Sequence, residues 1–183
     1  MSSMTMDLRG QPDIALAATR KKSLVRHENY FRREGGLSVT HVNEAGEVLP
    51  WLEELFAQHI ERWAATDSPS YFLQKKWREF FQRWAVSAAA RGWLRFTRLE
   101  WRGRSIAFHL GVCYRGNYIW YKPCFAIDLS RFSPGEVLLR QTLLAAIEEG
   151  ADTFDFGTGD DEYKKRFATD TREMRGMTLY PRA

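Results

Sequence analysis

The chain has 183 residues, of which 44% are hydrophobic, 14% aromatic and 27% charged, and its formal net charge is +4. This length allows one domain with a sizeable core, or one domain and an appendage. The composition excludes a disordered or collagen-like chain. The modest positive charge does not by itself imply a nucleic-acid partner.

The sequence offers no membrane-spanning segment, because its longest stretch without a formal charge is Ser105 to Tyr114 and a spanning helix needs about 20 apolar residues. The first nine residues lack the apolar core of a secretory signal, so we expect a cytoplasmic protein with no membrane partner. Cys113 and Cys124 fall several residues out of register on neighbouring predicted strands, which predicts two free thiols. No His/Cys cluster has metal-ligand spacing, so we predict no metal site.

Residues 1–19 contain Gly10 and Pro12 and are predicted to form an irregular N-terminal tail. A single domain is predicted over residues 20–183. Its first element is a helix over residues 20–34, the most basic segment of the chain. Those charges are typical of a solvated helix face, and an anion-binding face is the alternative interpretation.

The pattern after this helix predicts one strand at residues 37–42 and then two helices. The first has Pro50 in its opening turn, where proline is tolerated. The second covers residues 72–91 and has a broad apolar face that we predict to be core. That face consists of Leu73, Trp77, Phe80, Phe81, Trp84 and Ala88.

Three antiparallel strands follow at residues 93–100, 105–114 and 117–125, joined by short turns that contain glycine. Pro123 lies near the end of the third strand and cannot donate a hydrogen bond to a ladder. We therefore expect this strand to splay away from its next neighbour.

The strongest helix signal in the chain begins at Ser133, which is predicted to be the N-cap, with Pro134 in the first helical position and Glu136 completing a capping box. This helix is apolar on one face and ends at Gly150. Its length makes it a crossover, which predicts that the strand after it is parallel to an earlier one.

The last part of the chain is predicted to contain that strand at residues 153–156, a glycine turn at residues 157–159 and a short helix to about Phe167. Either Asp160 or Asp161 can cap the short helix. A final strand is expected from Met174 to Tyr180. The elements together predict an α+β protein with helices on both sides of a mixed, mainly antiparallel sheet.

Several motifs carry a family resemblance, and the most specific is the last of the following: Glu34-Gly35-Gly36, Arg62-Trp63, Phe132-Ser133-Pro134-Gly135, and Asp155-Phe156-Gly157-Thr158-Gly159-Asp160 running into Tyr163-Lys164-Lys165. With these motifs and this order of elements, residues 20–169 resemble the CelD-type acetyltransferases, named for cellulose biosynthesis, of the GNAT superfamily. The Fem-type peptidyltransferases are distant relatives. The resemblance implies a GNAT-like fold with α/β/α layers and a sheet splayed near its centre.

Proteins of this type commonly contain two GNAT-like halves, and this chain would match the second half. A missing half would leave an apolar face uncovered, so we expect self-association into a homodimer.

The start of the helix after Ser133 is our first candidate site. Free backbone N–H groups at Gly135, Glu136 and Val137, together with the helix dipole, can bind the pyrophosphate of coenzyme A. The alternative is that Ser133 and Glu136 simply cap one another. The usual GNAT glycine pattern is also altered, because Pro134 and Glu136 stand where two of its glycines belong.

The second candidate site is the V between the strand that ends near Pro123 and the strand at residues 153–156. In GNAT relatives such a V pairs with the pantetheine arm of the cofactor, and Tyr121 and Asp155 would flank it here. Acyl transfer to an amine needs a base and an acid, and the predicted catalytic residues are Asp160, Tyr163 and Asp155. Lys164 is predicted to contact the cofactor. The structural alternative is that these residues cap a helix or pack.

His109 alternates with the apolar face of its strand and can point toward the V as a further base. Our first functional hypothesis is an N-acyltransferase that uses acetyl-CoA or another acyl-CoA and a small-molecule amine as acceptor. The second is a Fem-like transferase that uses aminoacyl-tRNA, in which the basic segments 20–33 and 164–166 would contact RNA. The third is a GNAT-like domain without activity that serves for dimerisation or binding.

Overall fold

The computed structural model describes residues 2–64, 66–159 and 161–176. The described elements, in chain order, are β1 (Ser2–Asp7), α1 (Pro12–Thr19), α2 (Lys22–Arg33), β2 (Leu37–Val42), α3 (Ala45–Trp63), η1 (Tyr71–Leu73), α4 (Lys75–Ala89), β3 (Leu94–Trp101), β4 (Arg104–Tyr114), β5 (Asn117–Phe125), η2 (Ile127–Phe132), α5 (Pro134–Glu148), β6 (Thr153–Thr158), α6 (Glu162–Lys165) and β7 (Asp170–Glu173).

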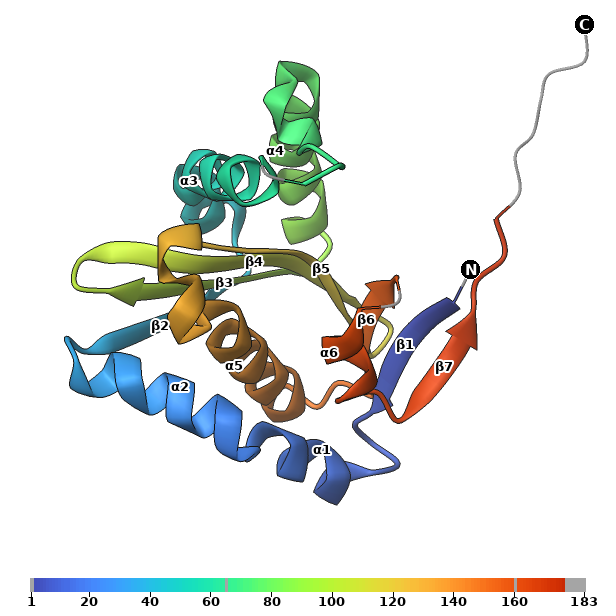
Figure 1. Cartoon of the computed structure of the whole chain (residues 1–183). Coiled ribbons are helices and arrows are strands. Elements are labelled where there is room, and N and C mark those ends of the chain that lie inside the picture. The colour runs from blue at the N-terminus through green and yellow to red at the C-terminus, as the bar shows by residue number, and fades with distance from the viewer. Residues whose placement is uncertain (1, 65, 160, 177–183) are drawn as a thin grey trace, which may run out of the picture.

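One seven-stranded sheet organises the molecule, in the order β2-β3-β4-β5-β6-β1-β7. Its neighbours are antiparallel except for β5 and β6, which are parallel. Helices α1, α2 and α5 cover one face of the sheet, and α3 and α4 cover the other (Figure 1). The predicted α+β layers, mixed sheet and parallel crossover through α5 are confirmed.

The two hairpins that join β3, β4 and β5 turn where the sequence predicts. Arg102 and Gly103 have φ values of 53° and 72°, and Arg115 and Gly116 have values of 49° and 74°. Two successive positive φ values define the tight hairpin turns that match the twist of the flanking strands. The two cysteines are free, because Cys113 pairs with Tyr118 across the ladder while the partner of Cys124 is Phe108.

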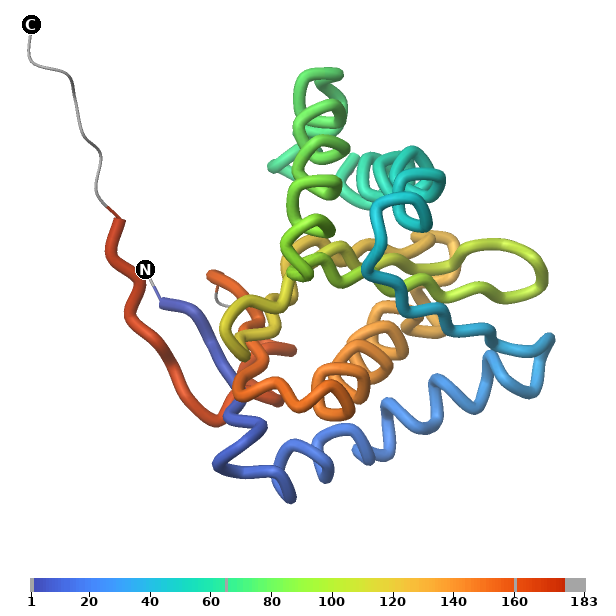
Figure 2. Tube along the Cα trace, turned by 180° about the vertical axis from the view of Figure 1, so that it is seen from behind, coloured from blue at the N-terminus to red at the C-terminus, as the bar shows by residue number. Residues whose placement is uncertain are grey.

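The prediction of an irregular tail over residues 1–19 is wrong. Residues 2–7 form β1, which lies between β6 and β7 (Figure 2), and residues 12–19 form α1. Met6 is fully buried and Leu8 nearly so. Tertiary pairing imposes the strand here, since β6 and β7 both need a partner for their backbone groups.

The predicted final strand from Met174 to Tyr180 is also misplaced. The strand is β7, at Asp170–Glu173, and it pairs with β1 in the register Ser2 to Glu173 and Thr5 to Asp170. Residues 174–176 are not in a strand, and residues 177–180 lie outside the described part of the chain. The position of β7 follows from the register of β1, an element that the sequence pattern did not reveal.

Helix α3 begins five residues before Pro50, so this proline lies in the second turn rather than the first. The apolar face predicted for the next helix is only partly core. Leu73, Trp77 and Phe80 are 60%, 38% and 46% exposed, because α4 stands out from the sheet and its fully buried side chains are confined to another side (Figure 1). None of the helices in the described ranges is long and apolar enough to cross a membrane.

Candidate functional site

The two parallel strands at the centre of the sheet part after a short run of pairing. Asn117, Tyr118 and Ile119 of β5 pair with residues 153–155 of β6. Beyond Ile119 the described residues form no further pair between these strands, although β5 continues to Phe125 and β6 to Thr158. This divergence is the predicted splay, and it exposes one edge of β5 near Pro123.

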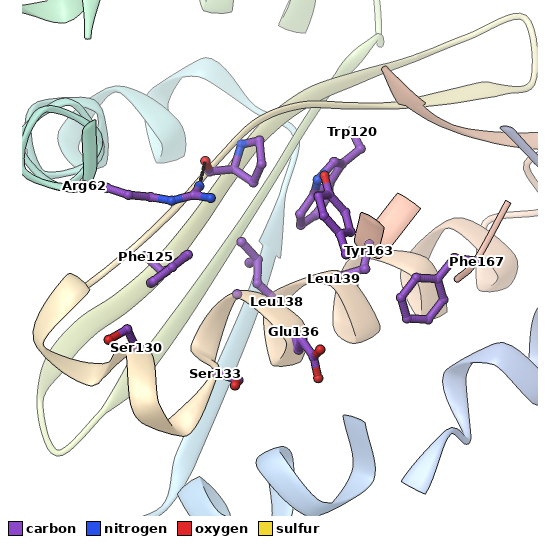
Figure 3. Close-up of a pocket in the computed structure, with 12 residues that line it drawn as sticks. Arg62, Trp120, Phe125, Ser130, Ser133, Glu136, Leu138, Leu139, Tyr163 and Phe167 are labelled. Atoms are coloured by element: carbon purple, nitrogen blue, oxygen red, sulfur yellow. Dashed lines mark hydrogen bonds between the residues drawn. The ribbon is translucent and has the colours of Figure 1, made fainter. Parts of the chain in front are cut away.

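A cavity of about 230 Å³ lies beside this edge, between β5, the first turns of α5 and the end of α3 (Figure 3). It is mainly apolar, with charged or hydroxyl groups at several points of its wall. The residues that line it are Arg62, Trp120, Pro123, Phe125, Ser130, Ser133, Gly135, Glu136, Leu138, Leu139, Tyr163 and Phe167. A pocket with this lining and a few polar groups is typical of a small-molecule or cofactor site.

Arg62, near the end of α3, is the cation in the wall on the β5 side. Its Nη1 donates a hydrogen bond to the carbonyl oxygen of Pro123 at 3.1 Å, and its guanidinium lies 4.5 Å from the centre of the Phe125 ring. Burial lowers its pKa from the ordinary value, although the group stays charged at neutral pH. In the described part of the chain no carboxylate pairs with it, so most of its five donors remain available.

Trp120 and Tyr163 form the opposite part of the wall, and Figure 3 shows their rings side by side. Trp120 is 5% exposed, and its Nε1 has no hydrogen-bond partner within the described ranges. Burial raises the pKa of Tyr163, so its phenol stays protonated and is suited to act as an acid rather than a base. The Trp120 indole beside the phenol acts in the opposite direction on this pKa, but the effect of burial is larger.

His109 lies directly behind Trp120. The two rings stack with their centres 4.7 Å apart, and the imidazole Nε2 accepts a hydrogen bond from the Tyr121 N–H at 3.4 Å. Complete burial lowers the pKa of His109 to about 3, so the ring is neutral. His109 supports the cavity wall and does not line the cavity.

The first turn of α5 differs from the predicted capping box. Ser133 has a φ of 57°, in the left-handed region, and its side chain makes no cap hydrogen bond. The Glu136 carboxylate instead forms hydrogen bonds with His27 Nδ1 and Arg166 Nη1, each at 3.0 Å. Both predicted interactions of the box are therefore absent from the structure, since a residue in this conformation does not have the extended geometry of an N-cap.

The backbone donors of this turn are largely used as well. The N–H groups of Glu136 and Val137 donate to the Ser133 carbonyl oxygen, at 3.0 and 3.3 Å, and Pro134 has no N–H. The prediction of three free N–H groups is wrong. Together with the Glu136 carboxylate, this arrangement does not fit a pyrophosphate at the start of α5.

The structure brings four of the predicted site residues to the cavity: Ser133, Gly135, Glu136 and Tyr163. Val137 is not among them, because it is fully buried in the core. Lys164 is 5% exposed and points to the turn after β6, where it donates to the Thr158 carbonyl oxygen and pairs with Asp161.

Asp155 and Tyr121 also lie away from the cavity. The Asp155 carboxylate accepts hydrogen bonds from the Ser3 hydroxyl of β1 and from the Gly157 N–H of its own strand, so it ties β6 to β1. Tyr121 packs against Phe81 of α4, on the other face of the sheet. Asp160 lies outside the described residues.

The sequence analysis did not propose the wall residues Arg62, Trp120, Phe125, Leu138, Leu139 and Phe167 as site residues. The alternation of β5 contains a signal for Trp120, because it shares a face with Tyr118 and Phe154. Arg62 is 58 positions before Trp120, and only the packing of α3 over β5 brings the two together. No cluster of three His, Cys, Asp or Glu side chains that could hold a metal is found among the described residues.

Comparisons with known proteins point to one superfamily. A family model described as "Acetyltransferase (GNAT) domain" matches residues 18–165. The structure is similar to that of FemX, with 12% identity and a TM-score of 0.65 over 93% of this chain and 59% of that chain. No curated protein matches in sequence.

Two further solved structures have the same architecture. One is the C-terminal domain of a putative lysylphosphatidylglycerol synthetase from Agrobacterium fabrum, with 17% identity and a TM-score of 0.57 over 90% of this chain and 48% of that one. The other is a conserved protein of unknown function from Bacteroides thetaiotaomicron VPI-5482, with 12% identity and a TM-score of 0.63 over 92% and 56%. The chain thus spans about half to three fifths of the structures that it matches, and at these identities the likeness shows the fold.

Proposed function

The chain belongs to the acetyltransferase (GNAT) domain family, and on that premise we propose that it is an N-acyltransferase whose cavity holds the acyl end of the donor. The observation that carries the proposal is the position of the cavity, at the point where β5 and β6 stop pairing. An extended donor arm can pair with the β5 edge that this divergence exposes. Membership of the CelD-type branch is part of the proposal.

The polar groups of the wall suit the chemistry of acyl transfer. The guanidinium of Arg62 and the phenol of Tyr163 are donors in an otherwise apolar cavity. When an amine nitrogen attacks an acyl carbon, the carbonyl oxygen gains negative charge, and donors in a dry site stabilise that charge. Collapse of the intermediate breaks the bond to the leaving atom, which takes a proton from Tyr163.

The amine must also lose a proton to a base. Asp160 and Asp155 are the predicted bases, but Asp155 already accepts two hydrogen bonds from Ser3 and Gly157. We therefore propose that Asp155 joins β6 to β1, and Asp160 remains the predicted base.

The proposed donor is acetyl-CoA or another acyl-CoA, and the acceptor is a small-molecule amine. The cavity fits an acyl group with part of an arm, whereas the first turn of α5 does not fit the pyrophosphate that the sequence analysis placed there. The phosphates would have to bind elsewhere. A cytoplasmic location and a homodimer remain predictions.

A binding and turnover series tests the proposal. Acetyl-CoA should raise the melting temperature in a saturable way, and thiol release in the presence of a panel of amines should report transfer. We expect Tyr163→Phe to lower turnover about 100-fold with little change in binding, because the acid is lost. Arg62→Met should weaken transfer about tenfold or more, since it removes a charged donor.

Matched controls for these variants lie on the surface away from the cavity. Tyr114→Phe changes a tyrosine that is 43% exposed and packs on Trp93, and Arg91→Met changes an arginine that contacts the same ring. Both should leave transfer unchanged. Saturable binding with equal turnover in Tyr163→Phe and Tyr114→Phe would contradict the role of the cavity, and no response to any acyl-CoA would contradict the donor.

The alternative donor is an aminoacyl-tRNA, and one observation favours it. The exposed side of α2 has a hollow of about 380 Å³ lined by four cations without an acid: Arg20, Lys22, Arg26 and Arg33, together with Val25 and Asn29. Such a surface is suited to a phosphate backbone. Salt-sensitive tRNA binding that Arg26→Ser weakens, without a response to acyl-CoA, would favour this function, and silence with both donors would favour a binding domain without activity.

A further inference from the structure

Helix α4 carries a stripe of large apolar side chains toward solvent, which we call the α4 stripe: Leu73 just before the helix, then Trp77, Phe80 and Trp84. The first three are 60%, 38% and 46% exposed, and Trp84 is partly buried. These positions are three to four residues apart, so they lie on one side of the helix. Tyr121 of β5, which is 44% exposed, contacts Trp84 at 6.1 Å between ring centres.

Trp84 packs against the core beneath α4, whereas Leu73, Trp77 and Phe80 lie outside that cluster. The buried side chains of the helix are Phe81, Ala85 and Ala88, which pack toward α3 and the sheet. Figure 1 shows α4 rising away from the sheet, so that its N-terminal end projects beyond the rest of this layer. Exposed aromatic side chains that contribute little to the core indicate a contact with something outside the domain.

The charge around the stripe is positive. Helix α4 has four cations, Lys75, Lys76, Arg78 and Arg83. Lys75 pairs with Glu79, the one acid of the helix, at 3.5 Å, and Arg78 pairs with Glu53 of α3 at 3.6 Å. Lys76 precedes Phe80 by four positions and Arg83 follows it by three, so both border the stripe.

Lys122 adds a cation from β5 at the edge of the same aromatic surface. Its Nζ lies 4.2 Å from the centre of the Tyr121 ring and 4.8 Å from that of Tyr71. A partner that binds this surface therefore meets three bordering cations, Lys76, Arg83 and Lys122, and negative charge on the partner would favour binding.

We propose that α4 docks on an anionic lipid bilayer, with the α4 stripe in the headgroup region and the bordering cations against lipid phosphates. Aromatic side chains beside Lys and Arg on one helix favour this interface. A second copy of the chain fits less well, because it would bring the same positive surface, on a chain of net charge +4, against itself. A nucleic-acid strand needs a groove, whereas α4 presents a projecting ridge (Figure 1).

This inference is independent of the proposed acyl transfer. It departs from the expectation of no membrane partner, which rested on the absence of a spanning segment. Docking of one helix at a surface does not require such a segment.

Vesicle co-sedimentation of the full chain tests the proposal. We expect binding to vesicles of phosphatidylcholine with about 30% phosphatidylglycerol, at least tenfold weaker binding to pure phosphatidylcholine, and weaker binding at high salt. The double variant Trp77→Ser, Phe80→Ser should lower vesicle affinity at least tenfold, because it removes two inserted rings. Lys76→Gln should lower it about fivefold.

Trp93→Ser is the matched control, since Trp93 is also 38% exposed but lies in the turn before β3, against Tyr114. It should bind vesicles as the unaltered chain does. Far-ultraviolet circular dichroism of each variant confirms that α4 is retained, which is expected because the substituted side chains are exposed.

Three results would overturn the proposal. The first is the absence of vesicle binding, and the second is binding that the double variant and Trp93→Ser alter equally. The third is a monomer–dimer equilibrium in sedimentation velocity that the double variant abolishes while vesicle binding persists, because the stripe would then be an interface between two copies.

Discussion

Two buried histidines should make this protein sensitive to mild acid. Complete burial lowers the pKa of His109 to about 3, and burial, with Lys122 and Arg62 nearby, lowers that of His59 to about 4. Both are below the ordinary value of 6.5. At pH values between the pKa of the folded state and that of the unfolded state, the unfolded chain binds more protons than the folded protein. The contribution of the two histidines to the free energy of unfolding is therefore complete above pH 6.5 and is lost as the pH falls.

The size of the effect follows from the same values. A pH of 5.0 lies about 1.5 units below the ordinary pKa of histidine, so both side chains are mostly protonated in the unfolded chain. In the folded protein they remain mostly neutral at this pH. At 1.36 kcal/mol per unit, each histidine lowers the free energy of unfolding by about 2 kcal/mol relative to pH 7.5, or about 4 kcal/mol together. That loss is a large part of the stability of a typical domain.

Urea unfolding at pH 7.5 and 5.0, followed by circular dichroism, measures this difference. His109→Asn should reduce the loss from about 4 to about 2 kcal/mol, whatever its effect at pH 7.5, because one titrating group has been removed. Ile106→Val on the same strand, at a fully buried position, is the control, since it should lower stability by about 1 kcal/mol at both pH values. An unchanged acid loss in His109→Asn would refute the reasoning.

Three further predictions concern the frame around the site. Deleting residues 1–9 should abolish cooperative thermal unfolding in circular dichroism, because β6 loses one of its two neighbouring strands and β7 loses the strand that joins it to the sheet. A sharp transition near that of the full chain would contradict the paired role of β1. Glu28→Ala should cost about 3–5 kcal/mol in urea unfolding, because it leaves Arg140 without its buried carboxylate, and a cost below about 1 kcal/mol would contradict this. Gly116→Ala should cost about 1–3 kcal/mol, since its φ is 74° and a Cβ would lie 2.3 Å from Asp152 Oδ2, whereas a neutral change would show that the turn relaxes.

Most of the helices and strands could be predicted from local sequence patterns. Strands β2 and β5 have the predicted bounds, and the turns at Gly103 and Gly116 lie where predicted. A splay of β5 from its next neighbour was also predicted, although it begins after Ile119, four positions before Pro123, and Pro123 itself lies opposite His109 in the ladder with β4. These features depend on residues close together in the chain, where periodicity and turn chemistry are informative.

The residues of the site could be predicted only in part. Tyr163 and the start of α5 were predicted, and both line the cavity. Arg62 was not predicted as a site residue, because it is 58 positions before Trp120 and no local pattern shows that α3 ends over β5. The local pattern at Ser133 predicted a capping box, but the Glu136 side chain forms long-range hydrogen bonds with His27 and Arg166 instead.

The sequence by itself determined the elements from α2 to β6, the hairpin turns at Gly103 and Gly116 and a helix long enough for a crossover, because each depends on residues close together in the chain. Tertiary structure alone decided that residues 2–7 become a strand inside the sheet, that Asp155 ties β6 to β1, and that α4 presents aromatic rings to solvent. Each of these outcomes depends on contacts between residues far apart in the chain, and the local sequence pattern does not show which distant residues come into contact.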